Sequence, residues 1–172
     1  SHDELTGLGN RAAFSALLAR LSCAQPGTWG LLAIDLDNLK TVNDTFGHQG
    51  GDDLLRMAAS RIAAAAAPDI TFRIGGDEFV VLLQSPESLA DMEATAQRIF
   101  AALAEPGDCG GFLVIASASI GGAVVSIEDD LPETVRENAD HALYFAKETG
   151  RGRFVRYWPG LGSPISDRIR MV

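Results

Sequence analysis

The chain has 172 residues, of which 47% are hydrophobic and 22% are charged, and these proportions are typical of one globular domain with a buried core. No apolar run approaches the roughly 20 residues of a membrane-spanning helix, and no signal peptide is recognisable. The formal net charge of −9 argues against a nucleic-acid polymer or an anionic membrane as a partner of this domain.

Cysteine and lysine are both rare in this chain. Cys23 and Cys109 lack CxxC spacing, and we interpret them as inert thiols of a cytoplasmic protein. Lysine occurs only at Lys40 and Lys147, against twelve arginines, which invites a specific role for each lysine. The dipeptide Ser1-His2 resembles a clipped or engineered start, so we expect the natural protein to extend upstream.

The first half of the chain predicts a helix, a strand and two further helices, in that order. The expected ranges are about 11–21 for the helix, 29–36 for the buried strand, and 39–46 and 52–67 for the next two helices. Gly47 should break the chain between the last two, because glycine weakens a helix interior.

The second half of the chain predicts a hairpin followed by alternating helices and strands. The expected ranges are 70–74 and 79–83 for the hairpin arms, 88–103 for a helix, 112–126 for a strand region, 131–149 for a helix and 154–158 for a last strand. We expect Gly121-Gly122 to form a bulge or bend and Gly150 to follow the last helix. The alternation indicates an α/β or α+β fold.

The segment Arg73-Ile74-Gly75-Gly76-Asp77-Glu78-Phe79 is the most informative part of the sequence. Two glycines between apolar arms predict a tight turn, because glycine adopts positive φ without a steric penalty. Adjacent carboxylates beside two bare backbone units are suited to a divalent metal and a phosphate ester. An ordinary hairpin with a solvated acidic tip is the alternative.

Asp35 and Asp37 follow four apolar residues at the end of the first strand. Charges in this position lie at the carboxyl edge of a sheet, where open α/β sheets bind ligands. If this strand neighbours the hairpin, Asp35 and Asp77 could share a metal. A strand end closed by solvated acids is the alternative.

The stretch from Asn43 to Asp52 contains three glycines, which we expect to hold a loop open between two helices. Asn43 and Asp52 can flank that loop. A carboxylate accepts hydrogen bonds from N1–H and the exocyclic amine of guanine, whereas adenine has no N1–H, so Asp52 would select guanine. Alternatively, Asp52 caps the following helix. His48 is expected to support the loop.

Lys147 and Arg151 are four residues apart across the end of the last long helix. This spacing lets both cations reach one phosphate chain, although cations also occur there to complement the helix dipole. The chain has no GxxxxGK[ST] or GxGxxG motif, so Walker-type and Rossmann sites lack support.

Taken together, these motifs resemble the GGDEF-domain family, the diguanylate cyclases. The similarity extends from about Asp3 to Arg156. It includes, in order, the segments 3–11, 35–40, 43–44, 47–48, 51–52, 73–79, 139–144, 146–147 and 150–151. Because so many separate motifs occur in the family's order, the chain is identified as a member of this family.

The resemblance implies an α+β fold, a ferredoxin-like palm similar to adenylyl cyclase catalytic domains. In this fold a central, mostly antiparallel sheet is flanked by helices and carries the GGDEF hairpin. The implied activity is that of a bacterial signalling nucleotidyltransferase, which condenses two GTP molecules into cyclic di-GMP and pyrophosphate. Each domain would hold one GTP, so the partner is a second GGDEF domain in a transient, face-to-face homodimer.

The resemblance also implies residue roles. Asp35, the Leu36 carbonyl and Asp77 would hold Mg²⁺ or Mn²⁺, and Glu78 would help to bind the metal or deprotonate the attacking 3′-hydroxyl. Asn43 and Asp52 would bind guanine. The remaining substrate contacts are expected at Leu39, Lys40, Arg73, Gly75, Gly76, Lys147 and Arg151.

Two departures from the family pattern qualify these expectations. Leu39 stands where the family usually has Phe. The RxxD motif of product inhibition is represented by Ala66-Ala67-Pro68-Asp69, which keeps the Asp and lacks the Arg. We therefore expect no feedback inhibition through this site, and restoring Arg at position 66 should create it.

We divide the chain into a GGDEF domain over 1–158 and a C-terminal linker over 159–172 that resembles connectors toward an EAL phosphodiesterase domain. An upstream sensor domain and a membrane anchor elsewhere in the full-length protein are compatible with this division. A GTP-binding regulatory module that controls a neighbouring EAL domain, with little cyclase activity of its own, is the alternative function.

Overall fold

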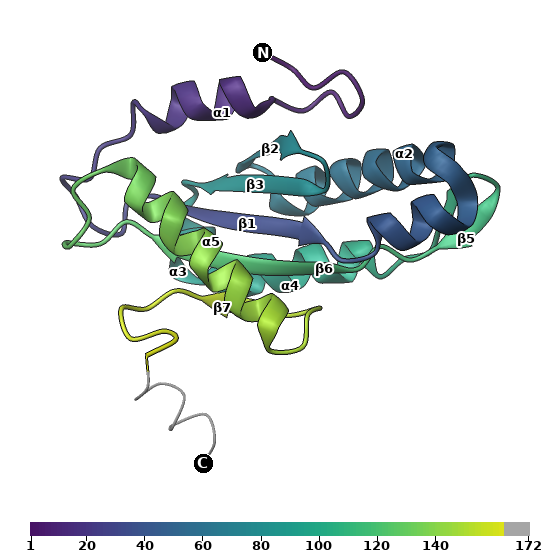
Figure 1. The fold of residues 1–172 in the computed structure, drawn as a ribbon. Helices are drawn as coiled ribbons and strands as arrows, with labels where there is room; N and C mark the ends of the chain where they lie inside the picture. Colours follow the sequence, from purple (N-terminus) through teal and green to yellow (C-terminus); the bar gives the residue numbers. More distant parts are fainter. Residues whose placement is uncertain (164–172) are drawn as a thin grey trace.

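The computed structural model describes residues 1–163 as helices packed on both faces of one central sheet (Figure 1). The remainder of the expected linker, residues 164–172, lies outside the described residues. The helices are α1 (Arg11–Leu18), α2 (Leu39–Ala66), α3 (Pro86–Ala90), α4 (Met92–Leu103) and α5 (Pro132–Glu148). The strands are β1 (Gly30–Leu36), β2 (Ile70–Gly75), β3 (Glu78–Leu83), β4 (Gly107–Cys109), β5 (Phe112–Val114), β6 (Ala118–Val124) and β7 (Phe154–Arg156).

The central sheet has the strand order β2-β3-β1-β6-β7 and is antiparallel except for the β6–β7 pair. Strand β1 lies in the middle, paired with β3 on one side and β6 on the other. This mixed sheet flanked by helices confirms the α+β fold expected from the sequence. No helix among residues 1–163 is long and apolar enough to cross a membrane.

Helices cover both faces of the sheet, and side chains of β1 alternate between them. Leu31 and Ala33 pack with residues of α1 and α5, whereas Leu32 and Ile34 pack with residues of α2 and α4. The strand is therefore buried on both faces, which explains its nearly continuous apolar sequence.

Helix α2 consists of two helical stretches joined at Gly47, where φ of 78° and ψ of 174° are not helical, so the break predicted at Gly47 is confirmed. The open loop predicted between Gly47 and Asp52 is absent, because the second stretch begins directly after the kink. Gly50 and Gly51 remain helical and buried. Their missing side chains leave room for neighbours, because a Cβ at Gly51 would lie 1.7 Å from Asn43 Oδ1. Asp52 is consequently inside a helix, and its predicted N-cap role is wrong.

The predicted helix over 88–103 is two helices, and Asp91 separates them. Its backbone is extended at φ −147° and ψ 82°, and its side chain accepts a hydrogen bond from the Ala94 N–H. Ser85 caps α3 in the same way. Aspartate and serine favour such caps over helix interiors, because their short side chains satisfy the free N–H groups of a helix start.

The region predicted as one strand over 112–126 contains two strands of different sheets. Strand β5 pairs with β4 in a separate hairpin, while β6 enters the central sheet. The three-residue strands of this hairpin are too short for a periodic pattern. The last strand is also shorter than predicted, and the chain after it stays packed as far as Leu161, which is buried.

Gly121 and Gly122 do not form the predicted bulge, because β6 keeps regular register with β1 at both positions. Their function is close packing. A Cβ at Gly121 would lie 2.1 Å from the Leu143 backbone nitrogen and 2.4 Å from the Ala139 carbonyl oxygen, both in α5. The absent side chain therefore lets α5 lie directly on the sheet.

We expect Gly121→Ala to lower the free energy of unfolding by about 3 kcal/mol or more, because rigid backbone atoms occupy the space of the new methyl group. Gly27→Ala is the matched control. It has a positive φ of 77° but open space around the position, and it should cost only about 1 kcal/mol. Urea unfolding of both variants checks the prediction, and equal losses would contradict it.

Candidate active site

The sheet register brings the first strand end and the GGDEF turn together. Asp35 in β1 lies directly opposite Glu78 in β3. The Leu36 N–H donates to the carbonyl oxygen of Asp77 at 3.1 Å. Gly75 ends β2 opposite Glu78, and Gly76 and Asp77 form the turn. The φ angles of Gly75 and Gly76 are 155° and 52°, which are conformations that favour glycine. The predicted proximity of Asp35 and Asp77 to one another is thus present.

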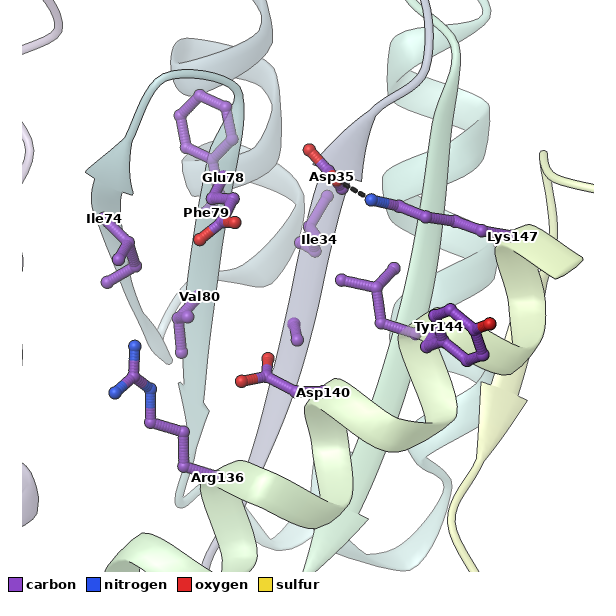
Figure 2. A pocket seen from close by; sticks show the side chains of 12 residues that line it. Ile34, Asp35, Ile74, Glu78, Phe79, Val80, Arg136, Asp140, Tyr144 and Lys147 are labelled. Atoms are coloured by element: carbon purple, nitrogen blue, oxygen red, sulfur yellow. Dashed lines mark hydrogen bonds and ion pairs between the residues drawn. The ribbon is translucent and has the colours of Figure 1, made fainter. Parts of the chain in front are cut away.

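Asp35 is a buried carboxylate, with 7% of its surface exposed. Its Oδ2 atom accepts a charged hydrogen bond from Lys147 Nζ at the end of α5 (Figure 2). Its Oδ1 atom is buried and has no hydrogen-bond partner among the described residues. An unpartnered buried oxygen on a carboxylate is costly unless a ligand satisfies it.

A cavity of about 210 Å³ lies between α5 and strands β1 and β3. Asp35, Glu78 and Lys147 line its upper part as drawn, and Arg136 and Asp140 line the lower part (Figure 2). The cavity thus continues from the predicted metal residues along the underside of α5.

Asp140 is a cavity residue to which sequence reasoning assigned no role. Partial burial raises the pKa of its carboxyl; the nearby Arg136 guanidinium opposes this change, and Glu78 adds to it. The spacing of Asp140 and Lys147 in the sequence could have indicated that Asp140 belongs to the site. Asp140 lies seven residues before Lys147, which is two turns on the same face of α5.

Asp77 lies in a partly desolvated turn. Burial raises the pKa of its carboxyl, while a hydrogen bond from its own backbone and the charge of Arg73 oppose the rise. Carboxylate oxygens that are not fully paired are suited to a hard divalent cation.

The described residues contain no ready-made group of three or more metal-binding side chains. The donor chemistry nevertheless fits a divalent cation, because Asp35 presents a buried free oxygen beside Asp77 and Glu78.

Arg73 holds the turn itself. Its Nε and Nη2 atoms donate to the Gly76 carbonyl oxygen at 3.1 and 2.9 Å. Its Nη1 atom pairs with the Asp3 carboxylate at 3.0 Å. These contacts hold the turn in shape. The expected contact of Arg73 with phosphate stays a prediction.

Arg151 and Lys147 lie near one another at the end of α5, and each faces a carboxylate there. Their expected contact with a phosphate chain stays a prediction. Arg151 Nη1 is 3.4 Å from Asp37 Oδ1, whereas Lys147 pairs with Asp35. Partial burial and the neighbouring Arg151 lower the pKa of the Lys147 ammonium. Arg151 itself has φ of 61°, an uncommon conformation outside glycine that occurs often at functional sites.

The other predicted substrate residues lie along the first half of α2. Leu39 begins the helix and packs partly on the core, and Lys40 pairs with Asp44 at 3.0 Å on the exposed side. Asn43 packs against Gly51, next to Asp52, across the Gly47 kink. The kink thus brings the two expected guanine contacts close in space without the loop that the sequence suggested.

Asp69 and Ala66, the remnants of the RxxD motif, are both part of the scaffold. Asp69 accepts from the backbone N–H groups of Gln84 and Ser85 at 2.8 and 2.9 Å and from the Ser85 hydroxyl at 2.9 Å. Ala66 is only 1% exposed and belongs to the core. Arginine at position 66 would therefore have to displace core packing, so the proposed restoration of feedback by Ala66→Arg is not a clean test.

A family model described as diguanylate cyclase, GGDEF domain, matches residues 1–153, and the chain belongs to this family. One relative is the diguanylate cyclase TpbB of Pseudomonas aeruginosa, 38% identical over 156 residues that cover 88% of this chain and 36% of TpbB. Another is the cyclic di-GMP phosphodiesterase PdeR of Escherichia coli, 37% identical over 169 residues that cover 97% of this chain and 25% of PdeR. The chain thus spans a quarter to about a third of these relatives.

Solved structures of GGDEF domains share the fold. The isolated GGDEF domain of TpbB, also called YfiN, matches with a TM-score of 0.84 and 34% identity over the whole of both chains. The GGDEF domain of DgcB from Caulobacter crescentus, solved in complex with c-di-GMP, matches with a TM-score of 0.79 and 32% identity, covering 90% of this chain and 94% of that chain. These matches confirm the family and the fold predicted from the sequence.

The hydrogen bonds that Asp69 accepts from Gln84 and Ser85 predict an acid-sensitive contribution to stability. Burial alone would raise the pKa of this carboxyl, but hydrogen bonds from Gln84, Ser85 and Ser88 outweigh that effect and lower it below its usual 3.8. The stabilisation is therefore complete above pH 3.8 and is lost as pH falls through the lower pKa of the folded protein.

We expect Asp69→Asn to cost about 1 kcal/mol or more at neutral pH, because it weakens several charge-assisted hydrogen bonds. The variant should also lose less stability than the natural chain as the solution is acidified. Asp130→Asn, on an exposed loop, is the control. Urea unfolding across acidic and neutral pH measures both effects, and parallel curves for Asp69→Asn and the natural chain would refute the assignment.

Proposed function

We propose that this domain is a diguanylate cyclase, which joins two GTP molecules into cyclic di-GMP. In this reaction each 3′-oxygen attacks the α-phosphate of the other GTP. Two phosphodiester bonds form, two pyrophosphates leave, and two hydroxyl protons are released. The observation that carries the proposal is the register of β1 with β3, which places Asp35 and Glu78 opposite each other at the mouth of the cavity beside Lys147.

A divalent cation is part of this proposal. Asp35, the Leu36 carbonyl and Asp77 would hold Mg²⁺ or Mn²⁺, with Glu78 as a further ligand or as the proton acceptor. Such an ion, when bound, polarises the phosphate and lowers the pKa of the attacking hydroxyl. The free oxygen of Asp35 supports the assignment.

Glu78 is the side chain best situated to accept the 3′-hydroxyl proton. It is an exposed carboxylate on the cavity wall, one strand away from Asp35. A general base must reach the hydroxyl at hydrogen-bonding distance, and the exposure of Glu78 leaves its carboxylate accessible to a substrate hydroxyl.

Recognition of GTP is shared between α2, the turn and the end of α5. Asn43 and Asp52 would bind the guanine edge, and their closeness around Gly51 supports this role. The remaining contacts, to phosphates and the nucleoside, are proposed for Leu39, Lys40, Arg73, Gly75, Gly76, Lys147 and Arg151.

The reaction requires two domains, because one domain would hold one GTP. Their encounter supplies proximity and orientation, which are large terms when two reactants must meet. We propose a transient, GTP-assisted homodimer in the cytoplasm, brought together by other parts of the full-length protein. Solved relatives include an EAL/GGDEF domain protein from M. capsulatus, which supports a neighbouring EAL domain in the full-length protein.

A regulatory GTP-binding module is the second candidate. The similarity to PdeR, a phosphodiesterase by name, over 97% of this chain favours it. In that case GTP would bind at the same residues and control an adjacent EAL domain, with little turnover of its own.

We expect Glu78→Gln to reduce cyclic di-GMP formation by about 100-fold or more while GTP binding is largely kept, because a general base contributes about 10²–10⁴-fold. The natural domain, incubated with GTP and Mg²⁺, should show a rate per molecule that rises with protein concentration. Product is identified by mass, and Glu105→Gln on an exposed loop is the control. A natural domain forced into dimers that binds GTP but makes no product would favour the regulatory module.

We expect GTP to bind at least tenfold more tightly than ATP, because adenine would leave the Asp52 carboxylate without its donor, at a cost of roughly 1–3 kcal/mol. Asp52→Ala should weaken GTP selectively and bring the two affinities together. Asp53→Ala, at the neighbouring position where the carboxylate contacts Gly110, Gln49 and Arg56 instead, is the matched control. Calorimetry with both nucleotides measures the difference, and equal affinities in the natural chain would exclude this role for Asp52.

A further inference from the structure

Lys147 and Asp35 are each needed for a different ligand, yet they bind each other in this structure. On the proposed function, Asp35 would ligate the cation and Lys147 would contact phosphate. We infer that Lys147 is a built-in counter-ion of Asp35, so that a divalent cation reaches Asp35 readily only when a nucleotide triphosphate draws the Lys147 ammonium away. This inference rests on the proposed function and adds an order to its binding steps.

The need for a counter-ion follows from the burial of Asp35. The residue is 7% exposed, and a carboxylate that is taken out of water must be paired or hydrogen-bonded. One oxygen has no partner and the other has Lys147. The ammonium is thus the positive charge that keeps this carboxylate compatible with its site when no cation is bound.

The neighbouring cations cannot replace Lys147 at this carboxylate. Arg151 faces Asp37 at 3.4 Å. Arg136 pairs with Glu133 at 3.3 Å and lies about three helical turns before Lys147 in α5. In the view of the cavity, the Lys147 side chain alone points to Asp35 from α5, while Arg136 lies at the opposite end (Figure 2).

Lys147 can nevertheless leave. Its side chain is 27% exposed, and a lysine ammonium is a single point charge on a long flexible stem, which can turn without movement of the helix. The helix itself is fixed, because α5 packs on Gly121 without intervening side chains. A phosphate chain near Lys147 and Arg151 would therefore attract the ammonium while α5 stays in place.

The inference implies that the metal and the nucleotide each raise the affinity of the domain for the other. This coupling is additional to the direct bonds between the phosphates and the cation. A nucleotide that removes the ammonium from Asp35 raises the affinity for the cation. By linkage, the cation raises the affinity for the nucleotide by the same factor. Without Lys147, this part of the coupling is absent.

The test is a titration with Mn²⁺ at mildly alkaline pH, in which electron paramagnetic resonance counts the free ion. It is made without nucleotide and again with saturating α,β-methylene GTP, which cannot release pyrophosphate. The proteins compared are the natural domain, Lys147→Met and Lys147→Gln. Arg151→Met is the matched control, because it removes the same charge but leaves the contact with Asp35. Circular dichroism verifies that each variant is folded.

Without nucleotide, we expect Lys147→Met or Lys147→Gln to bind Mn²⁺ about fivefold or more tightly than the natural domain, whereas Arg151→Met changes the affinity much less. The gain in Mn²⁺ affinity that the analogue produces should be smaller in the Lys147 variants by a similar factor. Asp35→Asn should abolish the difference.

Two results would overturn the inference. One is a Mn²⁺ affinity of folded Lys147 variants that is no higher than that of the natural domain. The other is an equal rise in Lys147→Met and Arg151→Met, which would reflect net charge alone. Neither result depends on turnover, so a domain that makes no cyclic di-GMP can still support the inference, and an active cyclase can still refute it.

Discussion

The close packing of α5 on the central sheet is the constraint on which the site depends. Gly121 lets the backbone of α5 approach β6, the strand next to β1. This close approach sets the distance from the sheet of every side chain that α5 presents to the cavity. Lys147 meets Asp35 and Asp140 faces the cavity because the helix lies there. A side chain at position 121 would lift the helix and widen the separation between the cations of α5 and the carboxylates of β1.

The sequence was sufficient to predict the elements that are marked by a pattern of several residues. The apolar run of β1, the arms around Gly75-Gly76 and the long helix before Gly150 each carry a pattern of several residues, and all are present. It was insufficient where one contact decides the conformation. The helix resumes directly after the break at Gly47 instead of after a loop, Asp91 ends one helix by capping the next, and Gly121 serves packing that only the opposing helix reveals.

The candidate site was predictable to a similar degree. The sequence suggested a shared site for Asp35 and Asp77 on the condition that the first strand neighbours the hairpin, and β1 does pair with β3. The partners of the charged groups could not be guessed. Arg73 and Asp69 each bind backbone atoms of the scaffold, because a backbone N–H or carbonyl group outside the regular sheet and helix bonding competes with a ligand for a nearby charge. A count of charges in the sequence cannot show which of them are already engaged.

The contact between Asp3 and Arg73 connects the start of the chain to the GGDEF turn. The segment before α1 adds no strand of its own to the five-stranded sheet and touches it through one isolated bridge, between Gly9 and Phe72 of β2. Its carboxylate nevertheless neutralises the guanidinium that supports Gly76. A shorter chain beginning at α1 would contain the residues of every strand and helix but would leave that guanidinium without its partner. The stretch that supplies the strands and helices is therefore shorter than the stretch that holds the turn in shape.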